Sequence, residues 1–235
     1  MHLPTTSWSL VLAAAADPTA DSRDSLATLF NTYWPAVYAF IRRSVHDRDQ
    51  AQDLTQAFFA AMLEKNYLGD ADPERGRFRT FLLSSVKHFV ANERDKARAL
   101  KRGGGNALLP IDAVDADAWY LPEAVEPRTP ESLFERRWAL SLLEQVMAKL
   151  RVEFAGKGKQ EYFDRLSPLL SGDPPANRYD ALAEELGASP GALRVGIHRM
   201  RRRYGDLLRA QIAETVSTPA EIDEELRFLL SALRL

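Results

Sequence analysis

Cysteine is absent from this chain of 235 residues, and its four histidines are widely separated. Disulfide bonds and thiolate zinc sites are therefore excluded, and a reducing compartment fits the composition. No run approaches the ~18 consecutive apolar residues that a membrane-spanning helix needs, so we expect a cytoplasmic protein without membrane insertion. A strong net charge is also missing, since the formal charge is only -2. Charge must therefore be examined segment by segment.

Strand-like alternation is missing as well, whereas apolar residues recur at intervals of three and four. We predict an all-α fold with two small helical domains joined by an acidic linker that contains proline and glycine. Residues 103–135, which include this linker, contain seven acidic residues and one basic residue, and the segment begins with three glycines. The predicted parts are an N-terminal arm (1–24), a first domain (25–102), the linker (103–133), a second domain (134–209) and a C-terminal helical tail (210–235).

The second domain contains the pattern of a helix-turn-helix. Gly187 suits the left-handed position that ends a helix, and an apolar helical face precedes it. Ser189 is a natural N-cap, and Pro190 suits the first position of the next helix. Two helices joined by a four-residue turn are therefore predicted here.

The second of these helices has one apolar face and one basic face. Leu193, Ile197 and Met200 fall in a narrow arc and should contact the core. Residues 194–209 contain six arginines and one acidic residue, so DNA phosphates should be attracted to this helix. The alternative is that the basic face is merely solvated. The candidate DNA contacts opposite the core arc are Gly191, Arg194, Val195, His198, Arg199 and Arg202.

Residues 75–102 form a second basic segment, with nine basic and two acidic residues. The helical period places Phe78, Leu82 and Phe89 on one side of a long helix. Basic residues, among them Lys87 and Arg94, fall on the other side. One basic helix in each domain suggests a single DNA molecule contacted at two places.

The preceding helix, DRDQAQDLTQAFFAAMLEK, has acidic and amide residues on its outer face. Phe59, Ala60 and Leu63 follow on this face, where a free monomer should be polar. A protein partner would explain these apolar residues. The alternative is that another helix of the same domain covers them.

Three motifs together resemble the extracytoplasmic-function group of RNA polymerase sigma factors. AQDLTQAFF is similar to the region 2 signature of the group, and RFRTFLLSSVKHFVANERDKARALKRGG is similar to its promoter-melting helix. YDALAEELGASPGALRVGIHRMRRRY is similar to region 4. The resemblance spans about residues 25 to 210, and it implies a protein that binds core RNA polymerase and promoter DNA.

The resemblance also implies roles for particular residues. The second domain would recognise the minus-35 element, while the loop from Asn66 to Arg77 and the helix after it would open the minus-ten element and hold a flipped base. The implied minus-ten contacts are Arg77, Lys87, Asn92, Arg94, Arg98 and Lys101. The implied polymerase-binding residues are Asp49, Gln52, Asp53, Gln56, Phe59 and Leu63.

The chain departs from the group at Ala57, where glutamate is usual, so a negative charge is missing from the polymerase-facing surface. Thr55 lies beside this position and is a candidate phosphorylation site, since some similar subgroups are controlled by a serine/threonine kinase instead of an anti-sigma factor. A phosphate would supply the missing charge. The alternative is a helix residue whose hydroxyl bonds back to the preceding turn.

Two other functions are compatible with parts of this sequence. An ordinary helix-turn-helix repressor or activator would bind its operator alone as a two-fold dimer. An enzyme acting on nucleic acid is disfavoured, because the sequence contains no P-loop, no metal-ligand cluster and no Ser/His/Asp arrangement. We therefore expect a protein without catalytic activity.

Overall fold

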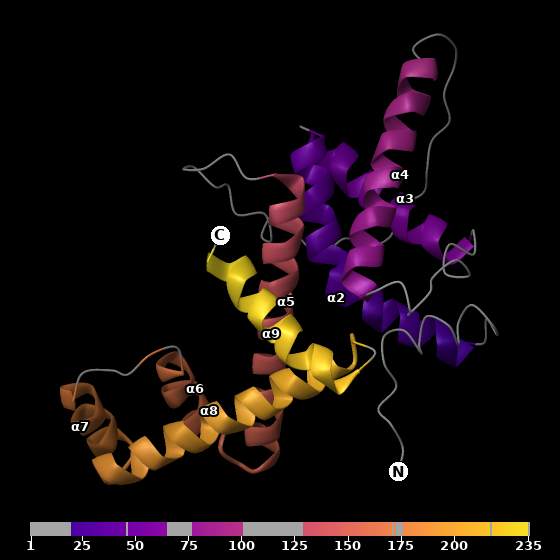
Figure 1. Cartoon of the computed structure of the whole chain (residues 1–235). Helices are drawn as coiled ribbons and strands as arrows, with labels where there is room; N and C mark the ends of the chain where they lie inside the picture. The colour runs from indigo at the N-terminus through magenta and orange to yellow at the C-terminus, as the bar shows by residue number, and fades with distance from the viewer. Residues whose placement is uncertain are drawn as a thin grey trace. The chain divides into compact units, whose positions relative to one another are not determined.

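The computed structural model describes residues 20–45, 47–64, 77–100, 129–170, 172, 176–216 and 218–234. Every regular element in these ranges is a helix, which confirms the predicted all-α fold. Most of the predicted arm and linker lies outside the described residues. The elements are α2 (Ala20–Ser44), α3 (Arg48–Glu64), α4 (Phe78–Leu100), α5 (Pro130–Gly156), α6 (Gln160–Leu166), the 3-10 helix η3 (Ser167–Leu169), α7 (Ala176–Glu185), α8 (Pro190–Ala213) and α9 (Pro219–Arg234) (Figure 1).

The described helices form two compact units. The first contains α2, α3 and α4 with α5 up to Ser141, and it also contains the chain from Ile212 to the end of α9. The second runs from Leu142 to Gln211. These units differ from the predicted division at residues 134 and 210. The physical reason is that the start of α5 and all of α9 bury side chains in the first unit.

Helices α2, α3 and α4 contact one another around an aromatic core. The Tyr33 ring of α2 meets the Phe78 ring of α4 edge-on at 5.2 Å between centroids. Helix α3 begins after Asp47, whose carboxylate accepts a hydrogen bond of 2.7 Å from the backbone N–H of Gln50. Asp47 is therefore the N-cap of α3. The core side chains of these helices include Tyr33, Val37, Ile41, Phe58, Met62, Phe78, Leu82 and Val86.

Helix α9 runs beside the first half of α5 (Figure 1), where the rings of Phe228 and Trp138 lie 6.1 Å apart. Leu229 and Ala232 of α9 are buried. The helix begins with a capping box, in which the Glu221 carboxylate accepts a hydrogen bond of 2.9 Å from the Thr218 N–H. The predicted helical tail is thus an integral part of the first unit.

The second unit is built on the remaining length of α5 with α6, α7 and most of α8. Leu150 of α5, Phe163 and Leu166 of α6, and Leu182 of α7 share one apolar cluster with Ile197 of α8. This cluster fixes which face of α8 turns inward. Among the described residues, no helix has the length and apolar character needed to span a bilayer.

Candidate nucleic-acid interface

The turn between α7 and α8 has the geometry that the sequence predicts. Gly187 has a φ of 60°, the left-handed conformation that costs glycine little. The Ser189 hydroxyl accepts a hydrogen bond of 3.2 Å from the N–H of Ala192, so Ser189 caps α8. Pro190 follows as the first residue of the helix. A rigid turn therefore sets the direction of α8 relative to α7.

Helix α8 presents the predicted basic face to solvent. Leu193, Ile197 and Met200 are buried in the core of the second unit. The Arg194 guanidinium lies over the Tyr179 ring, 5.1 Å from its centroid, so α7 helps to orient it. All the candidate minus-35 contacts are exposed on α8, namely Gly191, Arg194, Val195, His198, Arg199 and Arg202.

Two arginines of the same helix have structural partners. Arg201 donates hydrogen bonds to the carbonyl oxygens of Leu169, at 2.9 Å, and of Gly172, and it is only partly exposed. Arg203 donates to the carboxylate of Glu153 on α5, at 2.9 Å from Nε, and this contact lowers the pKa of Glu153. Part of the local positive charge therefore holds the unit together and is less available to phosphates.

Helix α8 approaches α6 closely at Gly196. A Cβ atom added there would lie 1.9 Å from Oη of Tyr162 and 3.1 Å from its Cζ. A larger side chain at this position would therefore require the Tyr162 side chain to move. The close contact fixes the position of the helix that carries the basic face.

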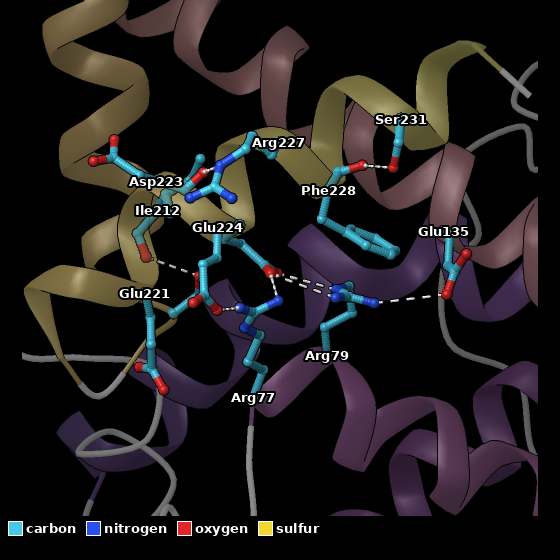
Figure 2. A network of polar contacts seen from close by, with 12 residues as sticks. Arg77, Arg79, Glu135, Ile212, Glu221, Asp223, Glu224, Arg227, Phe228 and Ser231 are labelled. Atoms are coloured by element: carbon cyan, nitrogen blue, oxygen red, sulfur yellow. Dashed lines mark hydrogen bonds and ion pairs between the residues drawn. The ribbon is translucent and has the colours of Figure 1, made fainter.

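In the first unit, acidic residues of α9 form ion pairs with arginines at the start of α4 (Figure 2). The Arg77 guanidinium contacts Glu224 and Glu225, each at 2.7 Å. Arg79 donates from Nε to Glu225 at 3.0 Å, and its guanidinium lies 3.6 Å from the Phe228 ring centroid. The side chains of Arg79 and Glu225 are 7% and 1% exposed, so this pair belongs to the core.

The other predicted minus-ten residues lie further along α4. Lys87 is exposed and forms an ion pair of 2.8 Å with Glu131 at the start of α5, and its hydrogen bond lowers the pKa of Glu131. Arg94 donates a hydrogen bond of 2.6 Å to the carbonyl oxygen of Ser44, the last residue of α2. Asn92 is exposed. The side chain of Arg98 and all of Lys101 lie outside the described residues.

The predicted polymerase-binding face of α3 is only partly on the surface. Asp49 and Asp53 are exposed, and Gln52 is half-buried. Gln56 is buried, and Phe59 is covered by α2. The Phe59 ring stacks on Trp34 at 5.3 Å and lies 4.9 Å from Phe30.

The expectation of an exposed apolar face is therefore wrong at Phe59, because a helix of the same domain covers it, as in the alternative interpretation. The side chain of Leu63 lies outside the described residues. The polar part of the face, formed by Asp49, Gln52 and Asp53, is the part that a partner can reach.

Thr55 is fully buried, and its hydroxyl donates a hydrogen bond of 2.7 Å to the carbonyl oxygen of Ala51. This is the back-bonded arrangement of the alternative interpretation. A kinase could therefore reach the Thr55 hydroxyl only after this part of α3 opens.

A cavity of about 410 Å³ lies between α3 and α4. Its lining combines the aromatic rings of Phe58 and Phe89 with the polar side chains of His88 and Asn92. The two rings meet edge-on at 5.5 Å between centroids. The cavity therefore offers apolar faces beside hydrogen-bonding groups.

Comparison with protein families identifies the first unit. Residues 29–99 match the family model described as Sigma-70 region 2. This segment of the chain is therefore similar to sigma-70 region 2. Comparisons with curated proteins and with solved structures gave no match.

The sigma-70 region 2 match begins in α2 and runs through α4. It includes the polar face of α3 and the cavity between α3 and α4. It also includes Arg77 and Lys87, each of which is ion-paired with glutamate. The first half of α5 and all of α9 lie beyond the match but within the same compact unit.

Sequence reasoning missed the acidic residues that contact this domain. Arg79 was counted among the nine basic residues of the segment 75–102, whereas the structure buries its side chain. The predicted C-terminal tail included Glu224 and Glu225 without a role for either residue. The available signal was the segment EIDEE at 221–225, which has four acidic residues in five positions. That segment alone does not reveal its partner.

Proposed function

We infer that this protein is a sigma factor of the extracytoplasmic-function type, which binds core RNA polymerase and directs transcription initiation at specific promoters. The inference rests chiefly on the sigma-70 region 2 match of residues 29–99. The capped turn between α7 and α8 and the exposed arginines of α8 support it, because a sigma factor needs a second site for promoter DNA.

Binding to core polymerase is the decisive test. Purified protein should capture core enzyme and support run-off transcription from cognate promoters. Asp53→Ala should weaken capture, because Asp53 is exposed on the polar face of α3. Glu161→Ala, an exposed acidic residue on α6, serves as the control. Specific operator binding as a dimer, without any affinity for core enzyme, would instead establish a helix-turn-helix repressor or activator.

Helix α8 is proposed to contact the minus-35 element. Arg199→Ala and Arg202→Ala should each reduce promoter-specific transcription, and a lost base contact costs about 1–3 kcal/mol. Arg203→Ala removes the same charge from the same helix but from an arginine paired with Glu153, so it is the matched control. Wild-type transcription by both test variants would refute the assignment of α8.

Helix α4 is proposed to act in opening the minus-ten element. The cavity between α3 and α4 has the aromatic and polar lining that suits an unstacked base. Alanine at Lys87, Arg94 and Arg98 should impair transcription from duplex templates more than from templates with a pre-melted bubble. Lys96→Ala is the control, because it removes a positive charge from the same helix at a residue that is not among the predicted minus-ten contacts. Equal defects on both templates would leave only general phosphate binding.

Control by a serine/threonine kinase at Thr55 is a further part of the proposal. A phosphate of about -1.5 to -2 charge cannot stay in the buried site of Thr55, so phosphorylation would force the start of α3 to rearrange. Core-polymerase affinity should then rise for the phosphorylated protein, stay low for Thr55→Ala, and be partly restored by Ala57→Glu. Equal binding by the unmodified, phosphorylated and Thr55→Ala proteins would exclude the switch and favour an anti-sigma factor.

A further inference from the structure

Helix α9 contacts the predicted DNA-binding side of the sigma-70 region 2 domain through two glutamates with different environments. Glu225 is 1% exposed and binds both Arg77 and Arg79. Glu224 is 59% exposed and binds only the second terminal nitrogen of Arg77, at 2.7 Å. Figure 2 shows Glu224 beside Arg77. One glutamate is therefore part of the core, while its neighbour is accessible to solvent.

The two terminal nitrogens of the Arg77 guanidinium therefore have partners that differ in exposure to solvent. Nη1 is held by the buried Glu225, and Nη2 is held by the exposed Glu224. An exposed ion pair contributes little net stability, because water and salt screen both charges. A buried pair, in contrast, is costly to separate. A competing anion should therefore replace Glu224 and leave Glu225 in place.

A nucleic-acid phosphate has the chemistry to make this replacement. Arginine binds phosphate and carboxylate oxygens with the same fork of N–H donors. The acidic start of α9, EIDEE at 221–225, carries several negative charges in one short segment. Lys87 of α4 is likewise ion-paired, with Glu131 of α5. Carboxylates of α9 and α5 thus form ion pairs with Arg77 and Lys87, two of the predicted DNA contacts.

We propose that α9 is an autoinhibitory element, in which Glu224 occupies Arg77 in the free protein and is displaced by a DNA phosphate. This proposal deepens the proposed function, since it rests on Arg77 being a promoter contact. Glu225, Arg79 and Phe228 keep α9 attached throughout, so the regulated event is the exchange of one ligand of Arg77. The expected consequence is reduced affinity of the free protein for DNA.

The test measures binding of the full chain to a fluorescently labelled forked DNA by anisotropy, without polymerase. Glu224→Gln should bind about two- to fivefold more tightly than wild type, the range expected for loss of one exposed competing ion pair. Asp223→Asn is the matched control, because it removes the same charge one residue away and points away from Arg77 in Figure 2. In an Arg77→Ala background, Glu224→Gln should have no effect.

Equal gains for Glu224→Gln and Asp223→Asn would overturn the proposal, since they would indicate only a change in net charge. A gain that persists with Arg77→Ala, or an absence of DNA binding by every variant, would overturn it as well. Capture of core polymerase by the wild-type protein is measured separately. If capture fails while the Arg77-dependent gain is present, the proposed function falls and the inhibitory contact stands.

Discussion

The buried ion pair between Arg79 and Glu225 allows a quantitative test of how α9 is held. Glu225→Gln preserves the shape of the side chain but removes the charge opposite a guanidinium that is 7% exposed. Breaking a buried pair by removing one partner costs about 3–5 kcal/mol, because the remaining charge is desolvated without compensation. In this variant the Arg79 guanidinium retains two contacts. They are the Phe228 ring, with its centroid at 3.6 Å, and the Glu135 carboxylate at 3.7 Å. We therefore expect a loss at the lower end, about 3 kcal/mol.

Urea unfolding followed by tryptophan fluorescence provides the assay, since Trp138 lies 5.1 Å from the Arg79 guanidinium. Glu224→Gln is the matched control, with the same chemical change at a side chain that is 59% exposed. It should change the free energy of unfolding by less than ~1 kcal/mol. The double variant Arg79→Met with Glu225→Leu should lose less stability than Glu225→Gln alone, because no unpaired charge remains at position 79 and Arg77 keeps Glu224.

A loss of less than ~1 kcal/mol for Glu225→Gln would refute this reasoning. It would mean that Arg79 reaches water without its partner, and that α9 is held by its apolar residues alone. Equal losses for Glu224→Gln and Glu225→Gln would also contradict it, because the argument depends on the difference in burial between the two glutamates.

Three further outcomes follow from local geometry. Gly196→Ala should destabilise the second unit by about 1–3 kcal/mol in a thermal melt, despite the higher helix propensity of alanine, because its Cβ would overlap Oη of Tyr162. Adding Tyr162→Phe should recover part of that loss; no recovery would disprove the assigned clash. Lys87→Ala should raise the pKa of Glu131 toward its ordinary value in an NMR titration, since the hydrogen bond from Lys87 is what lowers it. An unchanged pKa would exclude this pair in solution. Ser189→Ala should cost about 1 kcal/mol of unfolding free energy through loss of the α8 N-cap, whereas Ser189→Asp should retain the stability.

The sequence by itself determined the helices, their caps and the basic face of α8. These features depend on neighbouring residues: Gly187 ends one helix, Ser189 begins the next, and a spacing of three and four separates Leu193, Ile197 and Met200. Backbone hydrogen bonds and the 3.6-residue period act over a few positions, so they can be recognised in a linear pattern. The residues of the sigma-70 region 2 motif were recognisable for the same reason.

Only the tertiary structure decided which charged and aromatic side chains remain on the surface. Phe59 has the helical phase of an exposed residue until α2 covers it with Trp34. Arg79 belongs to a basic segment, yet Glu225, which is 146 positions away along the chain, pairs with it in the core. Helical period and local charge constrain each helix separately, and neither specifies which distant helix packs against it. The docking of α9 on the first unit therefore depends on long-range packing and charge pairing that no local pattern contains.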